Sequence, residues 1–139
     1  MAKEAGVLID GGASHNVYYS ATVPEGAEER DVDLAHGSRK GYLLDHDIIF
    51  IDKNMSHEQG RVPSIISMGR LVTYGAQVLW GQKGVFLKLP DGKIMKLRLW
   101  NKCPHANEKV VKIFEELKAK YVSEQRVKEK SRSYYTPLR

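Results

Sequence analysis

The chain has 139 residues, of which 42% are hydrophobic and 28% charged, and these values are typical of one soluble globular domain. No apolar run approaches the roughly 18 residues of a membrane span, and the N-terminus lacks the apolar core of a signal peptide. The single cysteine, Cys103, excludes an internal disulfide and suits a reducing compartment, so we predict a cytoplasmic protein.

The net charge of +5 is unevenly distributed along the chain, as a division after residue 106 shows. Residues 107–139 contain nine Lys and Arg against five Glu, whereas residues 1–106 contain thirteen basic and twelve acidic residues. The near-neutral first part does not predict a nucleic-acid-binding core. The basic tail could contact RNA, but a solvated helix face explains the same charges.

The first expected element is a short buried strand, residues 7–9, that leads directly into Asp10. Gly11, Gly12 and Ala13 follow, and such small residues allow a tight turn that leaves the carboxylate uncrowded. A carboxylate that follows a buried strand and precedes such a turn is expected at the floor of a functional site, not on a solvated face.

The middle of the chain predicts a long hairpin with a polar tip. Residues 31–35 alternate between polar and apolar, and residues 42–51 read as the returning strand, with a buried end at 48–51. The tip is expected at residues 36–41. Polar loops are expected before and after the hairpin, at residues 20–30 and 52–61.

The second half begins with an apolar strand at residues 62–69, followed by one or two helical turns that end before Gly75. Turn residues then separate three further strands, expected at 77–80, 85–89 and 93–100. The aromatic side chains in these strands are interpreted as core residues and not as stacking platforms for bases; they are Trp80, Phe86 and Trp100.

Apolar residues at three- and four-residue steps predict an amphipathic helix over residues 107–123, with Asn107 as its N-cap. This helix could pack on its own domain or across a dimer. The apolar pattern then weakens, so residues 124–139 are expected to form a basic, disordered tail.

Three features resemble a known family in their order and spacing. The turn at Asp10, the hairpin, and Ile66-Ser67-Met68-Gly69-Arg70-Leu71 are similar to the retropepsins, the homodimeric aspartic proteases of retroviruses and retrotransposons. Asp10 and Gly69 are 59 positions apart, close to the family interval. The sequences at residues 12–15 and 62–71 are most similar to proteases within copia-type retrotransposon polyproteins. The resemblance covers roughly residues 5–100.

The resemblance implies a mostly β fold, in which residues 1–106 form a retropepsin-like closed β-barrel protomer with a flap hairpin and an extra C-terminal hairpin. It implies an aspartic endopeptidase that cleaves a peptide or polyprotein. Two carboxylates must share one proton in this chemistry, and the chain has one such turn. Each copy of a homodimer would therefore contribute Asp10 as its catalytic residue, without a cofactor or metal ion.

The resemblance also implies the residues that bind substrate. Gly12, Ala13 and Ser14 would line the groove beside the catalytic turn. The flap tip would contribute three further residues: His36, Gly37 and Ser38. Gly37 and Gly41 would allow this tip to move. Ser14 and His15 could instead cap local backbone groups.

Gly11 departs from the family pattern, because retropepsins carry a hydroxyl residue there that hydrogen-bonds across the dimer axis. Its loss removes about 1 kcal/mol per bond, so the alternative is a weak or inactive dimerisation or binding module. Two other readings lack support in the spacing: a zinc site, or a nucleophile with a His base, formed by Cys103 with histidines such as His36, His46, His57 and His105.

Overall fold

The computed structural model describes residues 6–55 and 62–135 of the chain. Within these ranges the fold is mostly β with a C-terminal helix, which confirms the coarse prediction. The elements in chain order are β1 (Val7–Asp10), β2 (Asn16–Ser20), β3 (Glu28–Leu34), β4 (Gly37–Leu44), β5 (Asp47–Ile51), β6 (Val62–Ser67), α2 (Met68–Thr73), β7 (Gln77–Gly81), β8 (Gly84–Lys88), β9 (Ile94–Trp100), β10 (Cys103–Ala106) and α3 (Glu108–Tyr135).

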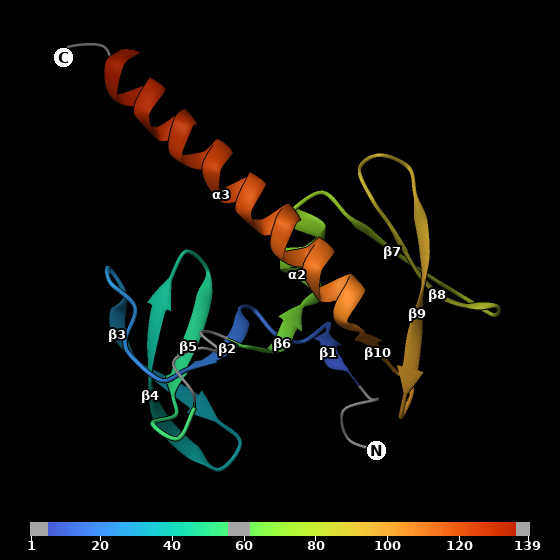
Figure 1. Ribbon diagram of the computed structural model, residues 1–139, viewed down its shortest axis with the longest axis horizontal. Coiled ribbons are helices and arrows are strands. Elements are labelled where there is room, and N and C mark those ends of the chain that lie inside the picture. Colours follow the sequence, from blue (N-terminus) through green and yellow to red (C-terminus); the bar gives the residue numbers. More distant parts are fainter. Residues whose placement is uncertain (1–5, 56–61, 136–139) are drawn as a thin grey trace.

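The strands form one sheet in the order β3-β4-β5-β2-β6-β1-β10-β9-β8-β7. Figure 1 shows β3, β4 and β5 on one side, β7, β8 and β9 on the other, and α3 crossing between them. The pairs β1–β6 and β2–β5 are parallel, and the other neighbours are antiparallel. The described strands are not closed into a barrel, so the closed-barrel part of the prediction is unconfirmed.

The parallel pairing of β1 with β6 fixes the position of Asp10. Ile9 lies opposite Ile66, and both side chains are buried in the core. Asp10 therefore lies opposite Ser67, the residue that ends β6 and caps α2. Two segments far apart in the sequence thus meet at the end of a buried strand pair.

The hairpin differs from the prediction at both ends. Its tip is the two-residue turn between β3 and β4, whereas Gly37–Gly41 were expected in the tip and instead lie in β4. A second turn at Asp45 and His46 divides the strand that we expected over 42–51. Both turn residues have positive φ, 53° and 93°, which the short polar Asp side chain and His tolerate better than most residues.

Gly41 does not act as a hinge in the tip. It is buried within β4, where an added Cβ would lie 3.0 Å from Val32 Cγ2 and 3.1 Å from Ile48 Cγ2. Close packing between neighbouring strands therefore explains this glycine, and the prediction that it gives the tip mobility is wrong.

The second half follows the prediction more closely. The short helix α2 is followed by Gly75 with a φ of +107°, and β7, β8 and β9 occur where they were expected. We did not predict β10, because a short segment with Pro104 reads as a loop. Trp80 and Trp100 are 57% and 45% exposed and are not core residues, because one lies on the end strand β7 and the other at the end of β9.

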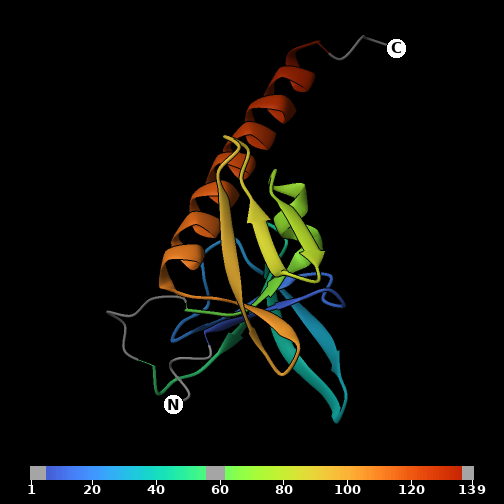
Figure 2. The same cartoon turned by 90° about the vertical axis from the view of Figure 1, so that its right-hand side faces the viewer.

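Helix α3 begins as predicted, with the Asn107 carboxamide oxygen accepting a hydrogen bond from the Val110 N–H at 2.9 Å. It packs on its own chain through buried Val110 and Phe114. The prediction of a disordered tail is wrong for residues 124–135, which continue the helix; residues 136–139 lie outside the described residues. Charged residues three and four positions apart, such as Glu124 and Lys128, favour a solvated helix. Figure 2 shows this end extending away from the sheet.

Candidate functional site

The carboxylate of Asp10 lies at an open turn. One of its oxygens, Oδ1, accepts a hydrogen bond from the Gly12 N–H at 2.8 Å, and the Ala13 N–H donates to the Asp10 carbonyl at 3.4 Å. Gly11 and Gly12 are exposed, and Asp10 itself is half-buried. The turn therefore orients one carboxylate oxygen and leaves the group uncrowded. The predicted position of Asp10 at the floor of a site stays a prediction.

Gly11 is not required by the backbone of this turn. Its φ lies outside the left-handed region that only glycine adopts readily. Among the residues that the structure describes, a Cβ built on Gly11 would meet only the Met68 sulfur, at 3.9 Å, which is an ordinary van der Waals distance. A hydroxyl residue would therefore fit at position 11 without a change in the fold.

Side chains from the junction of β6 and α2 hold the turn from behind. The Ser67 hydroxyl donates to the Ala13 carbonyl at 2.6 Å and accepts from the Arg70 N–H at 3.2 Å. The Arg70 Nε–H donates to the Ser14 carbonyl at 3.1 Å. Two consecutive carbonyls after the catalytic candidate are thus fixed by one serine and one arginine, both within the segment that resembles the retropepsins.

A buried amide continues this support inward. Asn16 is fully buried, and its side-chain oxygen accepts from the Ser67 N–H at 2.9 Å. Its Nδ2 donates to Asp47 Oδ1 at 3.0 Å and to the Tyr74 hydroxyl at 3.2 Å. Burial raises the pKa of Tyr74 to about 12, so this hydroxyl stays neutral near physiological pH. The amide therefore has a partner for its acceptor and for both donors.

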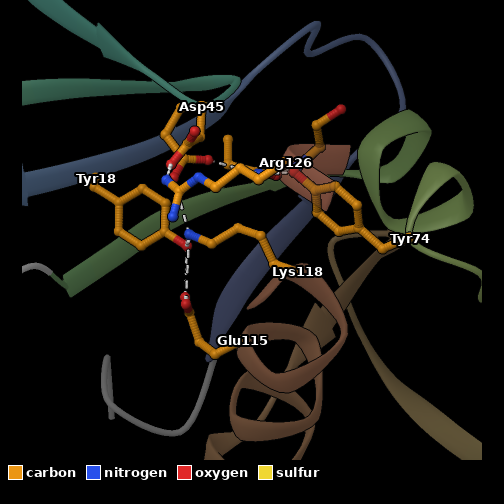
Figure 3. Close-up of polar contacts among 9 residues, drawn as sticks. Tyr18, Asp45, Tyr74, Glu115, Lys118 and Arg126 are labelled. Carbon is orange, nitrogen blue, oxygen red and sulfur yellow. Dashed lines mark hydrogen bonds and ion pairs between the residues drawn. The ribbon is translucent and has the colours of Figure 1, made fainter. Parts of the chain in front are cut away.

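Helix α3 completes the support with Lys118, whose side chain lies beside Tyr18 and Glu115 in Figure 3. Lys118 Nζ lies 2.8 Å from Asp47 Oδ2, and the two side chains are 12% and 2% exposed. Lys118 also donates to the Tyr18 hydroxyl at 2.6 Å and lies 3.4 Å from Glu115 Oε2. The Tyr18 hydroxyl donates to Glu115 Oε1 at 2.5 Å, so the lysine is enclosed by oxygens.

These contacts form one connected set, which we call the Lys118 network and define as Lys118, Asp47, Asn16 and Ser67. It runs from α3 through β5 and β2 to the start of α2, and it ends at the carbonyl of Ala13. Hydrogen-bonded buried charges are costly to separate. The position of the Asp10 turn therefore depends on a helix that lies outside the region of resemblance.

Ser14 and His15 interact with each other at the end of the turn. The Ser14 hydroxyl lies 2.8 Å from His15 Nδ1. Burial, followed by the positive charge of Arg70 and then that of His46, lowers the pKa of His15 below its usual 6.5, against a smaller raising effect of Asp47. This contact joins two side chains and no backbone group, so the capping interpretation and the predicted contact of Ser14 with substrate both stay predictions.

The predicted hairpin residues lie apart from the turn. His36, Gly37 and Ser38 are exposed, and among the described residues no hydrogen bond or ion pair joins them to Gly12, Ala13 or Ser14. The structure brings together the predicted residues of the turn but not those of the hairpin tip. The role of the tip in substrate binding therefore stays a prediction.

Sequence reasoning missed the Lys118 network, although one signal was present. Lys118 follows Phe114 by four positions and precedes Tyr121 by three, so it lies on the apolar face of the predicted helix. A charged residue in such a stripe indicates a buried partner. That partner, Asp47, lies 71 positions away in the sequence. No local pattern in the sequence identifies it as the partner of Lys118.

Within the described ranges, no three His, Cys, Asp or Glu side chains are grouped as metal ligands would be. His57, one of the histidines considered above, lies outside the described residues. Cys103 is exposed, and its carbonyl lies 2.9 Å from His105 Nδ1. None of the helices in the described part of the chain is long and apolar enough to cross a membrane.

Comparison of the chain with protein-family models, with curated proteins and with solved structures returned no match. The function must therefore be argued from the residues of the site.

Proposed function

We propose that this chain is a retropepsin-like aspartic endopeptidase that acts as a homodimer and cleaves peptide bonds in a polyprotein. The observation that carries the proposal is the turn at Asp10. Its carboxylate is oriented by the Gly12 N–H at an open glycine turn, and Ser67 and Arg70 fix the following carbonyls. These are the segments on which the sequence resemblance rests.

The chemistry follows from two carboxylates that face each other. One activates a water molecule, and the other, protonated, donates to the carbonyl of the scissile bond. Like charges about 3 Å apart do not both ionise easily, so the pair shares one proton and titrates as a unit. Since the chain has one Asp turn of this kind, Asp10 must come from each of two copies related by a two-fold axis.

Fixed placement of the turn supports this chemistry. Catalysis by positioned groups is sensitive to displacements of about 1 Å. The hydroxyl of buried Ser67 donates to the turn at the Ala13 carbonyl, and buried Asn16 in turn accepts from the Ser67 N–H. In the dimer the β3–β4 hairpin would act as the flap over an extended peptide, and each protomer would adopt the barrel of the family.

A homodimer would also explain why Asp10 does not line the cavity of the single chain described next. A cavity of about 880 Å³ lies between α3 and the β8–β9 connection, and no residue of the Asp10 turn lines it. In a homodimeric protease the substrate groove forms only between two copies. A single copy is therefore expected to present its catalytic residue on an open surface, as Asp10 is presented here.

The second candidate is a dimerisation or binding module without catalytic activity. The observation that favours it is Gly11, which cannot form the hydroxyl contact across the axis. The turn has room for the missing side chain, because among the described residues only Met68 lies near the Cβ position of Gly11.

The experiment is cleavage of a diverse peptide library by the full chain between about pH 4 and 7, with and without a statine-type inhibitor. Asp10→Asn is the test variant, because it keeps the size of the side chain and removes its charge. Asp45→Asn, at an exposed turn, is the matched control. Cleavage that the inhibitor and D10N both abolish, and D45N leaves intact, supports the protease. A folded, dimeric chain that cleaves nothing would establish the binding module instead.

A further inference from the structure

A second surface, unrelated to Asp10, lies on the sheet formed by β7, β8 and β9. Leu79 lies opposite Phe86, and Phe86 lies opposite Lys96, so these side chains project from the same face. Alternation along the strands places eight residues on this side, which we call the outer β7–β9 face: Gln77, Leu79, Phe86, Lys88, Ile94, Lys96, Arg98 and Trp100.

The outer β7–β9 face is unusually apolar for an exposed surface. The opposite face carries Val85, Leu87 and Leu97, which are buried in the core, so the outer face should be polar if its only neighbour were water. Yet Leu79, Ile94 and Trp100 are large hydrophobic residues that are exposed, and Phe86 is half-buried between them. Such a face indicates a binding partner.

The charge of this region indicates the chemistry of that partner. Residues 77–102 contain six Lys and Arg and one acid, Asp91, a net charge of +5 that equals the net charge of the whole chain. The three strands contain no acidic residue. Lys83, Lys96 and Arg98 also line a cavity of about 570 Å³, and none of the described residues that line it carries a carboxylate.

The aromatic and basic residues lie close together. The guanidinium carbon of Arg98 is 5.9 Å from the centre of the Trp100 ring, and Lys96 lies opposite Phe86 on the neighbouring strand. Unpaired bases stack on aromatic side chains, and Lys and Arg beside the rings neutralise the phosphates that connect those bases. A sheet face that alternates rings with cations therefore fits a single strand better than a duplex, whose bases are already stacked.

We propose that the outer β7–β9 face binds single-stranded nucleic acid, without strong sequence preference. A second copy of this chain is a poor occupant, because two faces with the same excess of positive charge repel each other. An anionic membrane also binds basic and aromatic side chains at its surface, so the vesicle competition below distinguishes it from nucleic acid. This proposal is independent of the protease and stands whether or not Asp10 is catalytic.

The test is fluorescence anisotropy of the full chain with a labelled oligothymidylate of about 15 nucleotides, between about 50 and 200 mM salt. Trp100→Ala should weaken binding roughly 5- to 150-fold, the usual effect of one lost stacking residue. The double variant K96A/R98A should weaken binding and reduce the salt slope by about 1.4, because a phosphate contact on a single strand contributes about 0.7. The matched control, K112A/K128A, removes the same charge from exposed positions on α3.

Retention of binding by K112A/K128A, with loss in the two face variants, supports the proposal. Absence of binding at the lowest salt would overturn it, as would equal loss in the α3 control, which would place the interaction on the helix. Tighter binding to the duplex of the same length, or complete competition by vesicles containing phosphatidylserine, would also overturn it in favour of that other ligand.

Discussion

The Asp10 turn and the β3–β4 hairpin were both predicted to bind substrate, and the molecule holds them in different ways. The turn is fixed by Ser67 of β6 and Arg70 of α2. Asn16 of β2 supports Ser67, and behind it lies the ion pair of Lys118 with Asp47. The hairpin is held mainly by its own strand pairing, with exposed ion pairs such as Lys40 with Glu29. A catalytic group gains from fixed geometry, whereas a segment that must admit a peptide gains from local freedom.

The largest expected effect comes from removing the cation that supports the turn. Lys118→Met leaves the Asp47 carboxylate buried without its charged partner, which should lower the free energy of unfolding by about 3–5 kcal/mol. Urea denaturation measures this change. The double variant K118M/D47N should recover most of the loss, because both partners are then uncharged. If K118M alone were as stable as the wild type, the Lys118 network would not hold the turn.

A smaller effect of opposite sign is expected at the turn itself. Gly11→Ser fits the space beside Met68 and reduces the freedom of the unfolded chain, so stability should rise by about 0.4–1 kcal/mol. If the enzyme is limited by the missing hydroxyl, its cleavage rate and dimer affinity should rise as well. Gly11→Ala is the control, since it supplies the Cβ without the hydroxyl. Destabilisation by both variants would show that glycine is required here.

The pH dependence of the free energy of unfolding should reveal His15, which lies at the end of the Asp10 turn. Because the pKa of His15 is lowered in the folded chain, the unfolded chain binds a proton first as the pH falls below 6.5. His15 therefore contributes nothing to the pH dependence well above pH 6.5 and reduces stability progressively below it. His15→Gln should flatten this part of the profile, and an NMR titration of the ring measures the pKa directly. A titration midpoint above 6.5 would contradict the assignment.

The smallest change in stability is expected at the hairpin tip. His36→Ala and Ser38→Ala should each change the free energy of unfolding by less than about 0.5 kcal/mol, because both side chains are exposed and make few contacts. If the tip closes over substrate, the same variants should raise KM for peptides. Urea denaturation and peptide kinetics on the same samples separate the two effects. A large loss of stability would show that the tip is as tightly held as the turn.

Local signals in the sequence were sufficient for much of the fold. The apolar strand before Asp10, the glycine after α2 and the cap at Asn107 each depend on neighbouring residues, and each occurs where it was expected. The turn at Asp45 was missed although three consecutive polar residues, Asp45, His46 and Asp47, interrupt the apolar pattern there, because no glycine or proline marks the turn. The strand β10 was missed because its pairing with β1 and β9 overrides a weak local preference.

The candidate site was predictable only in part, for a similar reason. Asp10 and its small neighbours form a continuous motif, but Asp47 and Lys118 are 71 positions apart and meet only in the folded chain. The positive charge of the outer β7–β9 face was missed for another reason. Dividing the chain after residue 106 averaged the basic strands with acidic residues of the β3–β4 region, which lies at the other end of the sheet.

The central claim is that one catalytic site requires two copies of Asp10. Titration calorimetry of the full chain with a tight statine-type inhibitor tests this claim directly, because it counts sites per chain. A homodimeric protease should bind one inhibitor for every two chains, with binding lost in D10N and kept in D45N. A ratio of one inhibitor per chain, or no binding by a folded dimer, would contradict it.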